Sequence, residues 1–231
     1  AASAAPAPAA ARAFWDVASA AAPEESAARL AASMSDEELL GQTLCLGYLG
    51  TAPSAEIRAW IRDRGIGGVK IFSRNVADLP SLARDVAEMQ RLSQSTRLGV
   101  PLLVATDQEG GWVRHIKRET SVTPGNLAIG AAGLPRDAYL TGWYLGRELA
   151  ALGINMDFAP TADTYSDPAA SAIGPRSFGS DPAAVGLLCA AYAAAGANEP
   201  APDGASYRRT IVRSLRDHAL ETQQAGCFVM K

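Results

Sequence analysis

Apolar positions along the chain follow two patterns, one typical of amphipathic helices and one typical of buried strands. In the helical segments apolar residues recur three and four positions apart, as Ile57, Trp60 and Ile61 do within 54–64. The strands are short runs that are apolar almost throughout. The pattern predicts helices over 12–32, from the Ser35–Glu38 capping box to just before Gly41, and over 54–64, 78–96, 137–152, 181–195 and 206–225, with strands over 43–48, 68–72, 102–106, 154–158 and 227–230.

Apolar strands separated by helices indicate a parallel sheet that is covered on both faces. Two architectures fit this alternation, an open doubly wound sheet and a (β/α)8 barrel, and a barrel needs eight strands where five are visible. No G-x-G-x-x-G or Walker-type sequence is present, which counts against the nucleotide-binding, doubly wound alternative. We therefore expect an α/β fold, a (β/α)8 TIM-barrel-like domain that is incomplete in this chain.

Composition narrows the class of ligand. Hydrophobic residues make up 48% of the 231 residues and charged ones 19%, which is typical of a globular protein with a substantial core. The net charge of −3 gives no basic footprint for nucleic acid or anionic lipid, and no apolar run approaches the ~20 residues of a membrane span. We expect a small neutral substrate, no nucleic-acid partner and no membrane span.

The ends of the chain differ in composition from its middle. Residues 1–11 are an Ala/Pro-rich stretch typical of a spacer, and we predict that residues 1–33 form an arm with an N-terminal helix. Residues 34–231 are predicted to form the barrel domain, with a gap or shortened loop at 196–206. Such spacers follow removed signal peptides or lipid anchors, which favours an exported or envelope-associated protein over a cytoplasmic one; a ragged chain end fits the same residues.

Cysteine and histidine usage argues against a metal centre. Cys45, Cys189 and Cys227 lie far apart without a C-x-x-C pair, and we expect them to be buried core thiols. With only two histidines a multi-histidine metal site is not available, so no such metal centre is expected.

Polar residues that directly follow predicted strands are the candidate ligand contacts, because parallel α/β folds bind ligands at the carboxyl ends of their strands. Asp107, in the segment VATDQEGG, is the strongest candidate, since an ionised carboxylate can accept hydrogen bonds from two sugar hydroxyls. Capping of the following loop is the structural alternative for Asp107. The other candidates at strand ends are Gln108, Glu109, Ser73, Arg74, Asn75 and Asp163.

Three further side chains each have two interpretations. For Glu109 we favour a structural role, as a partner of Arg114 or of loop N–H groups, over ligand contact. Trp112 could stack on a sugar face, although packing is the commoner role for an indole beside Gly-Gly. Lys70 points either to solvent or into a polar barrel centre.

A combination of motifs then resembles one known family. The order GGVKIFSRN (67–75), VATDQEGGWVRH (104–115), TPG (123–125), NMDFAPTAD (155–163) and IGPRSFGSDP (173–182) is similar to the family-3 glycoside hydrolases, and in particular to their bacterial β-N-acetylhexosaminidase branch. The match runs from about Met34 to Tyr192.

The resemblance implies roles for individual residues. Asp107 would bind hydroxyls of a terminal N-acetylglucosamine, and Arg176 would reach the same sugar from the loop after the FAP strand. A guanidinium fork suits a sugar oxygen, and an ion pair with a nearby Asp is the alternative for Arg176. The family has an Arg eight residues beyond the Asp, where this chain has His115, so either His115 or Arg114 would fill that sugar-contacting place.

The catalytic residues that the resemblance implies do not appear in the sequence. The K-H-F-P-G-H-G segment with its acid/base, and the Asp nucleophile further on, have no counterpart, and ANEPAPDGAS follows Gly196. We expect missing coverage rather than a natural remnant, and the catalytic residues are unknown. By resemblance the protein would release terminal β-linked N-acetylglucosamine from peptidoglycan or chitin-type fragments with retention, and without a metal or an organic cofactor. The alternatives are an inactive sugar-binding or scaffold protein on the same barrel, and a different α/β enzyme such as a phosphate-binding barrel.

Overall fold

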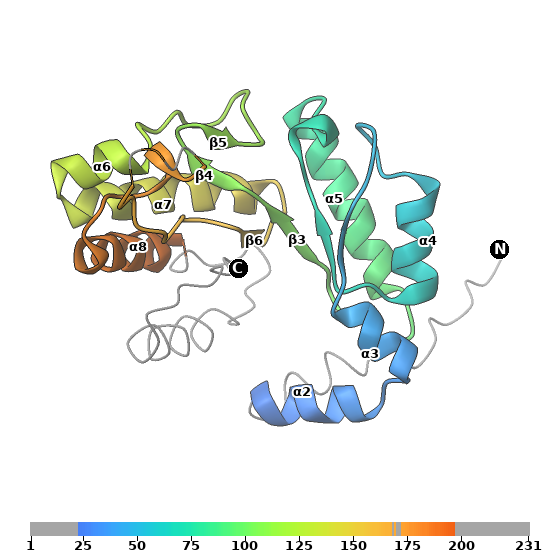
Figure 1. The fold of residues 1–231 in the computed structure, drawn as a ribbon. Coiled ribbons are helices and arrows are strands. Elements are labelled where there is room, and N and C mark those ends of the chain that lie inside the picture. Colours follow the sequence, from blue (N-terminus) through green and yellow to red (C-terminus); the bar gives the residue numbers. More distant parts are fainter. Residues whose placement is uncertain (1–22, 168, 170–171, 197–231) are drawn as a thin grey trace. The chain divides into compact units, whose positions relative to one another are not determined.

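The protein divides into two compact units (Figure 1). The computed structural model describes residues 23–167, 169 and 172–196. Within these residues, unit 1 runs up to Lys70 and includes Arg84–Val104, while unit 2 comprises Ile71–Ala83 and the residues from Ala105 onward. The candidate strand-end residues 73–75, 107–109 and 163 all belong to unit 2.

Unit 2 contains the end of a parallel sheet and three helices that pack beside it. Strand β3 (Leu103–Thr106) pairs in parallel with β6 (Met156–Asp157), and the N–H of Ile71 donates to the carbonyl of Ala105 at 2.7 Å. The remaining elements are the strands β4 (Gln108–Gly110) and β5 (Val113–Arg114), the 3-10 helices η2 (Ser73–Asn75) and η3 (Gly174–Arg176), and the helices α6 (Asn126–Ala132), α7 (Pro135–Ala151) and α8 (Pro182–Gly196).

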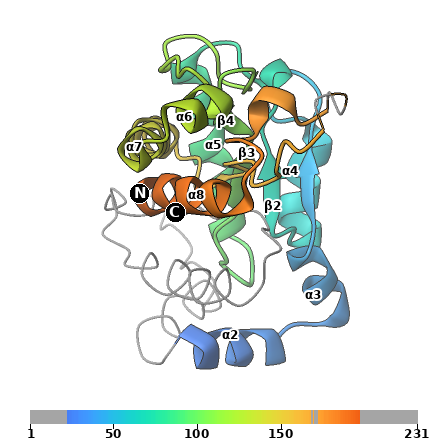
Figure 2. The ribbon, with the colours of Figure 1, turned by 60° about the vertical axis from the view of Figure 1, so that its left-hand side comes forward.

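The core of unit 2 lies where α7 and α8 pack against each other (Figure 2). Its buried apolar side chains come from all three helices and from the loops between them: Ile129, Ala138, Leu145, Ala159, Phe178, Val185, Leu188, Cys189 and Tyr192. The two helices approach so closely that a Cβ at Gly142 would lie 2.2 Å from the carbonyl oxygen of Tyr192. Glycine at 142 is therefore what permits this helix contact.

Unit 1 packs two amphipathic helices against short strands. It contains α2 (Pro23–Ala32), α3 (Asp36–Gln42), α4 (Ala55–Arg64) and most of α5 (Leu79–Gln94). Strand β1 (Cys45–Gly47) pairs in parallel with β2 (Gly68–Lys70), and the N–H of Leu103 donates to the carbonyl of Gly67 at 2.9 Å. The parallel strands and alternating helices of the two units confirm the predicted α/β class.

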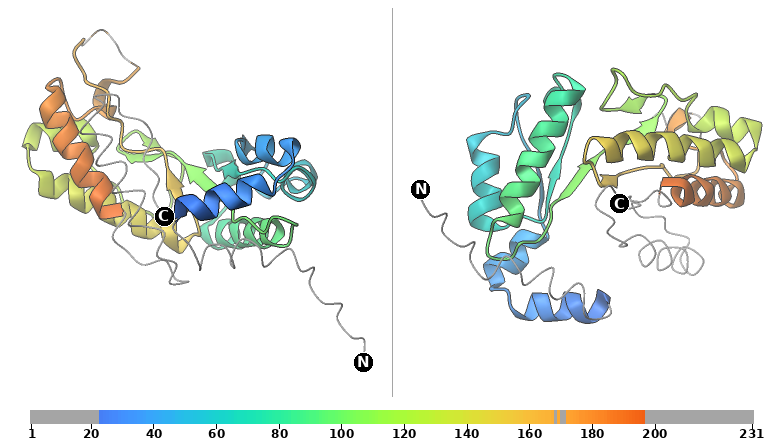
Figure 3. Two further views of the ribbon diagram at one scale, coloured as in Figure 1. Left: turned by 90° about the horizontal axis from the view of Figure 1, so that it is seen from below. Right: turned by 180° about the vertical axis from the view of Figure 1, so that it is seen from behind.

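The bounds of α4 agree with the predicted helix over 54–64. Ser54 accepts a hydrogen bond from the N–H of Ile57, and Gly65 ends α4 with φ of 57° in the left-handed region. Helices α4 and α5 lie side by side (Figure 3), joined by an ion pair of 2.8 Å between Arg58 Nε and Glu88 Oε1. The predicted apolar face of α4 is only partly right, because Ile57 and Ile61 are buried while Trp60 is 36% exposed.

The predicted burial of the cysteines is wrong for one of them. Cys189 is buried in α8, but Cys45 is exposed. Strand β1 alternates exposed and half-buried residues, so the described residues leave its outer side chains uncovered. Cys227, the helix over 206–225, the strand over 227–230 and the first part of the helix over 12–32 lie outside the described residues.

Two elements of unit 2 were not predicted. Helix α6 begins after Gly125, whose φ is 89° and which offers no capping side chain, so its start carries none of the usual sequence signals. The β4–β5 hairpin contains Gln-Glu-Gly, which has no alternation of apolar and polar residues. No helix in the described part of the chain is long and apolar enough to cross a membrane.

Candidate functional site

A short hairpin brings the two ends of the DQEGGWVRH segment together. Strands β4 and β5 pair antiparallel, with Gln108 opposite Arg114, and the N–H of His115 donates to the carbonyl of Asp107 at 3.2 Å. Gly110, the last residue of β4, and Gly111, the first residue of the turn, have φ of 87° and 55°, which residues other than glycine rarely adopt. Asp107 and His115 consequently lie next to each other at the open end of the hairpin, directly after β3.

The His115 imidazole is held through both ring nitrogens. Its Nε2 lies 3.0 Å from Asp107 Oδ2, and its Nδ1 lies 3.1 Å from the hydroxyl of Ser73 in η2. Phe72 meets the ring edge-on, with ring centroids 5.2 Å apart. The Asp107 and His115 side chains are each 23% exposed, so both are ordered by partners and still reach solvent.

A second pair of oppositely charged side chains, Glu109 and Arg176, lies in the same unit. Arg176, in η3, donates from Nε to Glu109 Oε2 at 3.0 Å and from Nη2 to Glu109 Oε1 at 2.6 Å. Thr161 Oγ1 also donates to Glu109 Oε2, at 2.8 Å. The Glu109 side chain is 3% exposed and that of Arg176 is 34% exposed. The buried carboxylate thus grips one edge of a guanidinium that remains partly open to solvent.

The Glu109 hydrogen bonds raise the pKa of Arg176 above its ordinary value. Burial acts in the opposite direction, while the charges of Glu109, Asp163 and Asp107 raise the pKa further. Arg176 is therefore a permanent cation in a field set mainly by carboxylates. Its backbone is fixed as well, because Asn126 Nδ2 donates to the Arg176 carbonyl at 2.8 Å.

Buried hydrogen bonds hold the hairpin in place. The amide side chain of Gln108 bonds both the carbonyl and the N–H of Ile116, at 2.8 and 3.1 Å. Asp157 Oδ1 accepts from the Gln108 N–H, and the buried Tyr192 hydroxyl donates to the Gln108 carbonyl. Burial raises the pKa of Tyr192 well above its ordinary value, so this hydroxyl keeps its proton. Gln108 is a structural residue here.

Arg114 and His115, the two candidates for one sugar contact, have different hydrogen-bond partners. Arg114 donates from Nη1 to the carbonyl of Ser121 at 3.0 Å, whereas His115 bonds Asp107. The predicted pairing of Glu109 with Arg114 is wrong, because Glu109 pairs with Arg176 instead. The predicted packing of Trp112 is also wrong, since this indole is 76% exposed next to the hairpin turn. Ser73, itself a strand-end candidate, and Phe72 contact His115, whereas Thr161 contacts Glu109.

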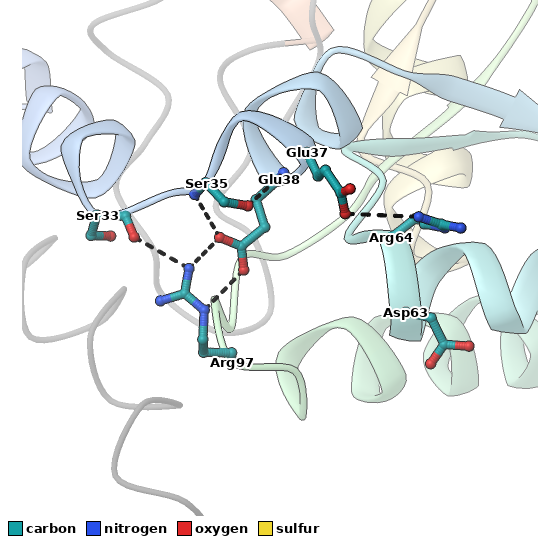
Figure 4. Close-up of a pocket in the computed structure, with 7 residues that line it drawn as sticks. All are labelled: Ser33, Ser35, Glu37, Glu38, Asp63, Arg64 and Arg97. Atoms are coloured by element: carbon teal, nitrogen blue, oxygen red, sulfur yellow. Dashed lines mark hydrogen bonds and ion pairs between the residues drawn. The ribbon is translucent and has the colours of Figure 1, made fainter.

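The described residues provide no cluster of three or more His, Cys, Asp or Glu side chains that could hold a metal ion. A separate cavity of about 440 Å³ lies in unit 1 (Figure 4). There the Arg97 guanidinium bonds both Glu38 oxygens, and Glu38 closes a capping box with Ser35. None of the candidate strand-end residues lines this cavity.

Comparisons with known proteins agree on one family. Residues 34–201 match the N-terminal domain of glycosyl hydrolase family 3. Beta-hexosaminidase A of Pseudoalteromonas piscicida is 37% identical over 177 residues, which cover 67% of this chain and 29% of that protein.

Solved structures give the same result. A family 3 beta-N-acetylglucosaminidase from Paenibacillus sp. str. FPU-7 has a TM-score of 0.68 at 36% identity, over 71% of this chain and 31% of that one. A beta-N-acetylhexosaminidase from Beutenbergia cavernae DSM 12333 has a TM-score of 0.62 at 32% identity, over 71% of this chain and 51% of that one. The matched part of the chain thus spans between 29% and 51% of the length of these three relatives.

Proposed function

The chain belongs to glycosyl hydrolase family 3, and on that premise we propose that it supplies the sugar-binding part of an enzyme releasing terminal β-linked N-acetylglucosamine. Peptidoglycan or chitin-type fragments are the proposed substrates. The names of the relatives, a beta-hexosaminidase and a beta-N-acetylglucosaminidase, support this class of substrate. The retaining mechanism is part of the proposal and follows from the family resemblance.

One observation carries the proposal: the Asp107 carboxylate lies directly after β3, oriented by His115 and only partly exposed. A carboxylate accepts hydrogen bonds from sugar hydroxyls, and bonds to a charged acceptor are stronger than neutral ones. Arg176 complements it as a donor to sugar oxygens. We assign Asp107, His115 and Arg176 to the terminal sugar, whereas Arg114 supports the hairpin through Ser121.

We do not assign the nucleophile or the acid/base to Asp107 or Glu109. Retaining hydrolysis needs a nucleophile and an acid/base about 5–5.5 Å apart, on opposite sides of the reacting carbon. Glu109 is a poor choice for either, because it is 3% exposed and both its oxygens bond Arg176. In this proposal Asp107 and Glu109 serve sugar recognition, and neither the nucleophile nor the acid/base comes from the DQEGG segment.

The contacts of Asp107 with His115 and of Glu109 with Arg176 also fit a second candidate function, a sugar-binding protein without turnover. The two proposals differ in one measurement, release of 4-nitrophenol from 4-nitrophenyl N-acetyl-β-glucosaminide by the full-length protein. The enzyme proposal predicts saturable release that Asp107→Ala abolishes. N-acetylglucosamine binding without release at any pH from acid to neutral would support the binding protein and refute the enzyme.

A further inference from the structure

The contacts of Arg176 leave one edge of its guanidinium for a ligand. Of its five N–H groups, the Nε–H and one on Nη2 bond Glu109, and one on Nη1 bonds the Ala172 carbonyl at 3.3 Å. Beyond these three hydrogen bonds to described residues, Nη1 and Nη2 each keep one further N–H. The side chain is 34% exposed, so these two N–H groups, on the outer edge of the guanidinium, are the candidate donor pair for a ligand.

Glu109 determines where that donor pair points. The Glu109–Arg176 bonds use the side edge of the guanidinium, and Thr161 fixes the carboxylate by donating to Oε2. Asn126 anchors the Arg176 backbone carbonyl. The side chain is therefore fixed at both ends, and rotation that would turn the outer edge away costs the bidentate pair.

Glu109 also determines what charge a ligand meets at this edge. Its buried carboxylate offsets the arginine charge at a distance of 2.6 Å, and Asp107 and Asp163 add negative charge within electrostatic range of Arg176. Arg74, another cation of unit 2, stacks on the Phe72 ring, with its Cζ atom 4.3 Å from the ring centroid. An uncharged oxygen can accept from the donor pair, whereas an anion there is repelled by three carboxylates.

We propose that Glu109 is a specificity-determining positioning residue, which holds the outer N–H pair of Arg176 in place and offsets its charge so that the site selects an uncharged sugar over an anionic one. This inference rests on the proposed function, in which Arg176 contacts the sugar. It assigns the selection against anions to Glu109 rather than to Arg176 alone.

The wild-type protein provides the first test, which needs no substitution. Calorimetric titration compares N-acetylglucosamine with its analogue that carries a carboxylate at carbon 6. We expect the anionic analogue to bind at least about 10-fold more weakly. Equal or tighter binding of the anionic analogue overturns the inference. Absence of binding by either sugar refutes the proposed function itself.

The second test replaces the carboxylate. In Glu109→Gln we expect N-acetylglucosamine to bind about 10-fold more weakly, and inorganic phosphate to compete about 10-fold more strongly, because the arginine charge is no longer offset. Glu109→Asp keeps the charge but shortens the reach, so sugar binding falls without a gain in phosphate competition. Glu56→Gln, an exposed glutamate of α4, is the matched control and changes neither.

A merely structural role for Glu109 predicts a different result. Loss of sugar affinity in Glu109→Gln without any gain in phosphate competition would overturn the inference, with retained folding checked by thermal unfolding. If Glu109→Gln does not fold, phosphate competition is measured on Glu109→Asp, where stronger competition would overturn the inference because this variant keeps the charge. Normal N-acetylglucosamine binding by the wild type alongside an unchanged Glu109→Gln variant leaves the proposed function standing and removes only this inference.

Discussion

At the scale of single residues, the candidate site consists of two pairs, Asp107 with His115 and Glu109 with Arg176, whose side chains differ in solvent exposure. Asp107 and His115 are equally exposed, whereas Glu109 is buried beneath a partly exposed Arg176. A partly exposed, oriented carboxylate can exchange water for sugar hydroxyls at low cost, because its orientation is already fixed. A buried carboxylate can act only through the side chain it holds.

Asp107 is expected to carry the largest single share of sugar affinity. Removing its charge in Asp107→Asn should weaken N-acetylglucosamine binding by about 10- to 100-fold, since a hydrogen bond to a charged group contributes about 1.5–3 kcal/mol. Calorimetric titration measures this, with the exposed Asp36→Asn as control. An affinity that stays within about twofold of the wild type would contradict the role of Asp107.

His115 and Arg114 form a matched pair of neighbours with different expected effects. His115→Gln should weaken sugar binding about 5-fold or more, because Asp107 loses the partner that orients it, and a typical hydrogen bond contributes about 1 kcal/mol. Arg114→Gln should leave sugar binding unchanged, because the Arg114 guanidinium bonds the Ser121 carbonyl and supports the hairpin. The reverse order of effects would transfer the sugar-contacting role to Arg114.

Sequence reasoning predicted the strand-end residues but not their partners. Asp107 and Ser73 were predicted as candidates because a polar residue after an apolar strand can be recognised from the local sequence. The partner of Glu109 was not predictable, because Arg176 is 67 positions away and reaches it only through η3 and the loop before it. Trp112 was misjudged because neighbouring glycines do not indicate which side of the turn faces solvent.

At the scale of elements, close helix packing in unit 2 depends on one glycine. Gly142→Ala should destabilise the fold by about 1–3 kcal/mol, since the added methyl collides with the Tyr192 carbonyl of α8. Gly186→Ala, in α8, is the matched control: it meets open space, so alanine's higher helix propensity should stabilise by up to about 1 kcal/mol. Urea unfolding of both variants gives the comparison. Equal effects of the two substitutions would show that the α7–α8 contact is not close.

The α3 cap in unit 1 predicts a pH dependence with a defined sign. Hydrogen bonds from Arg97 and from the Ser35 N–H lower the pKa of Glu38, so its contribution to stability is present above the unfolded pKa of about 4.3 and is lost as pH falls through the folded value. Glu38→Gln keeps the capping box but removes the ion pair. We expect it to destabilise by up to about 1 kcal/mol at about pH 7 and by less near pH 3.

Thermal unfolding at the two pH values measures this difference. Glu37→Gln serves as the control, because Glu37 is 86% exposed and its carboxylate lies 3.8 Å from Arg64 Nη1. If the destabilisation by Glu38→Gln grew as the pH fell, the ion pair with Arg97 would not be its cause.

Elements with strong start and stop signals were predicted well. The capping box of α3 and the bounds of α4 lie where the sequence predicts them. Helix α6 lacked such signals, and its position is set by tertiary contacts: a Cβ at Gly130 would lie 1.6 Å from the Phe178 carbonyl oxygen. Contacts of this kind are invisible to local patterns.

At the scale of the whole molecule, all residues assigned to the sugar lie in unit 2, which contains both members of the Asp107–His115 pair and of the Glu109–Arg176 pair. The α/β class followed from apolar strands that alternate with helices along the chain. Membership of the family followed from several motifs in a fixed order, since the DQEGG segment, the FAP strand and the G-x-R-S-F loop become specific only together. The substrate remains a proposal at this scale.

The central claim is that Asp107 binds a terminal N-acetylglucosamine, and one calorimetric comparison tests it most directly. N-acetylglucosamine is titrated into the wild-type protein and into Asp107→Ala, with folding of both verified by thermal unfolding. The predicted result is saturable binding by the wild type and no detectable binding by the variant. Equal binding by the two proteins, or no binding by the folded wild type, would contradict the claim.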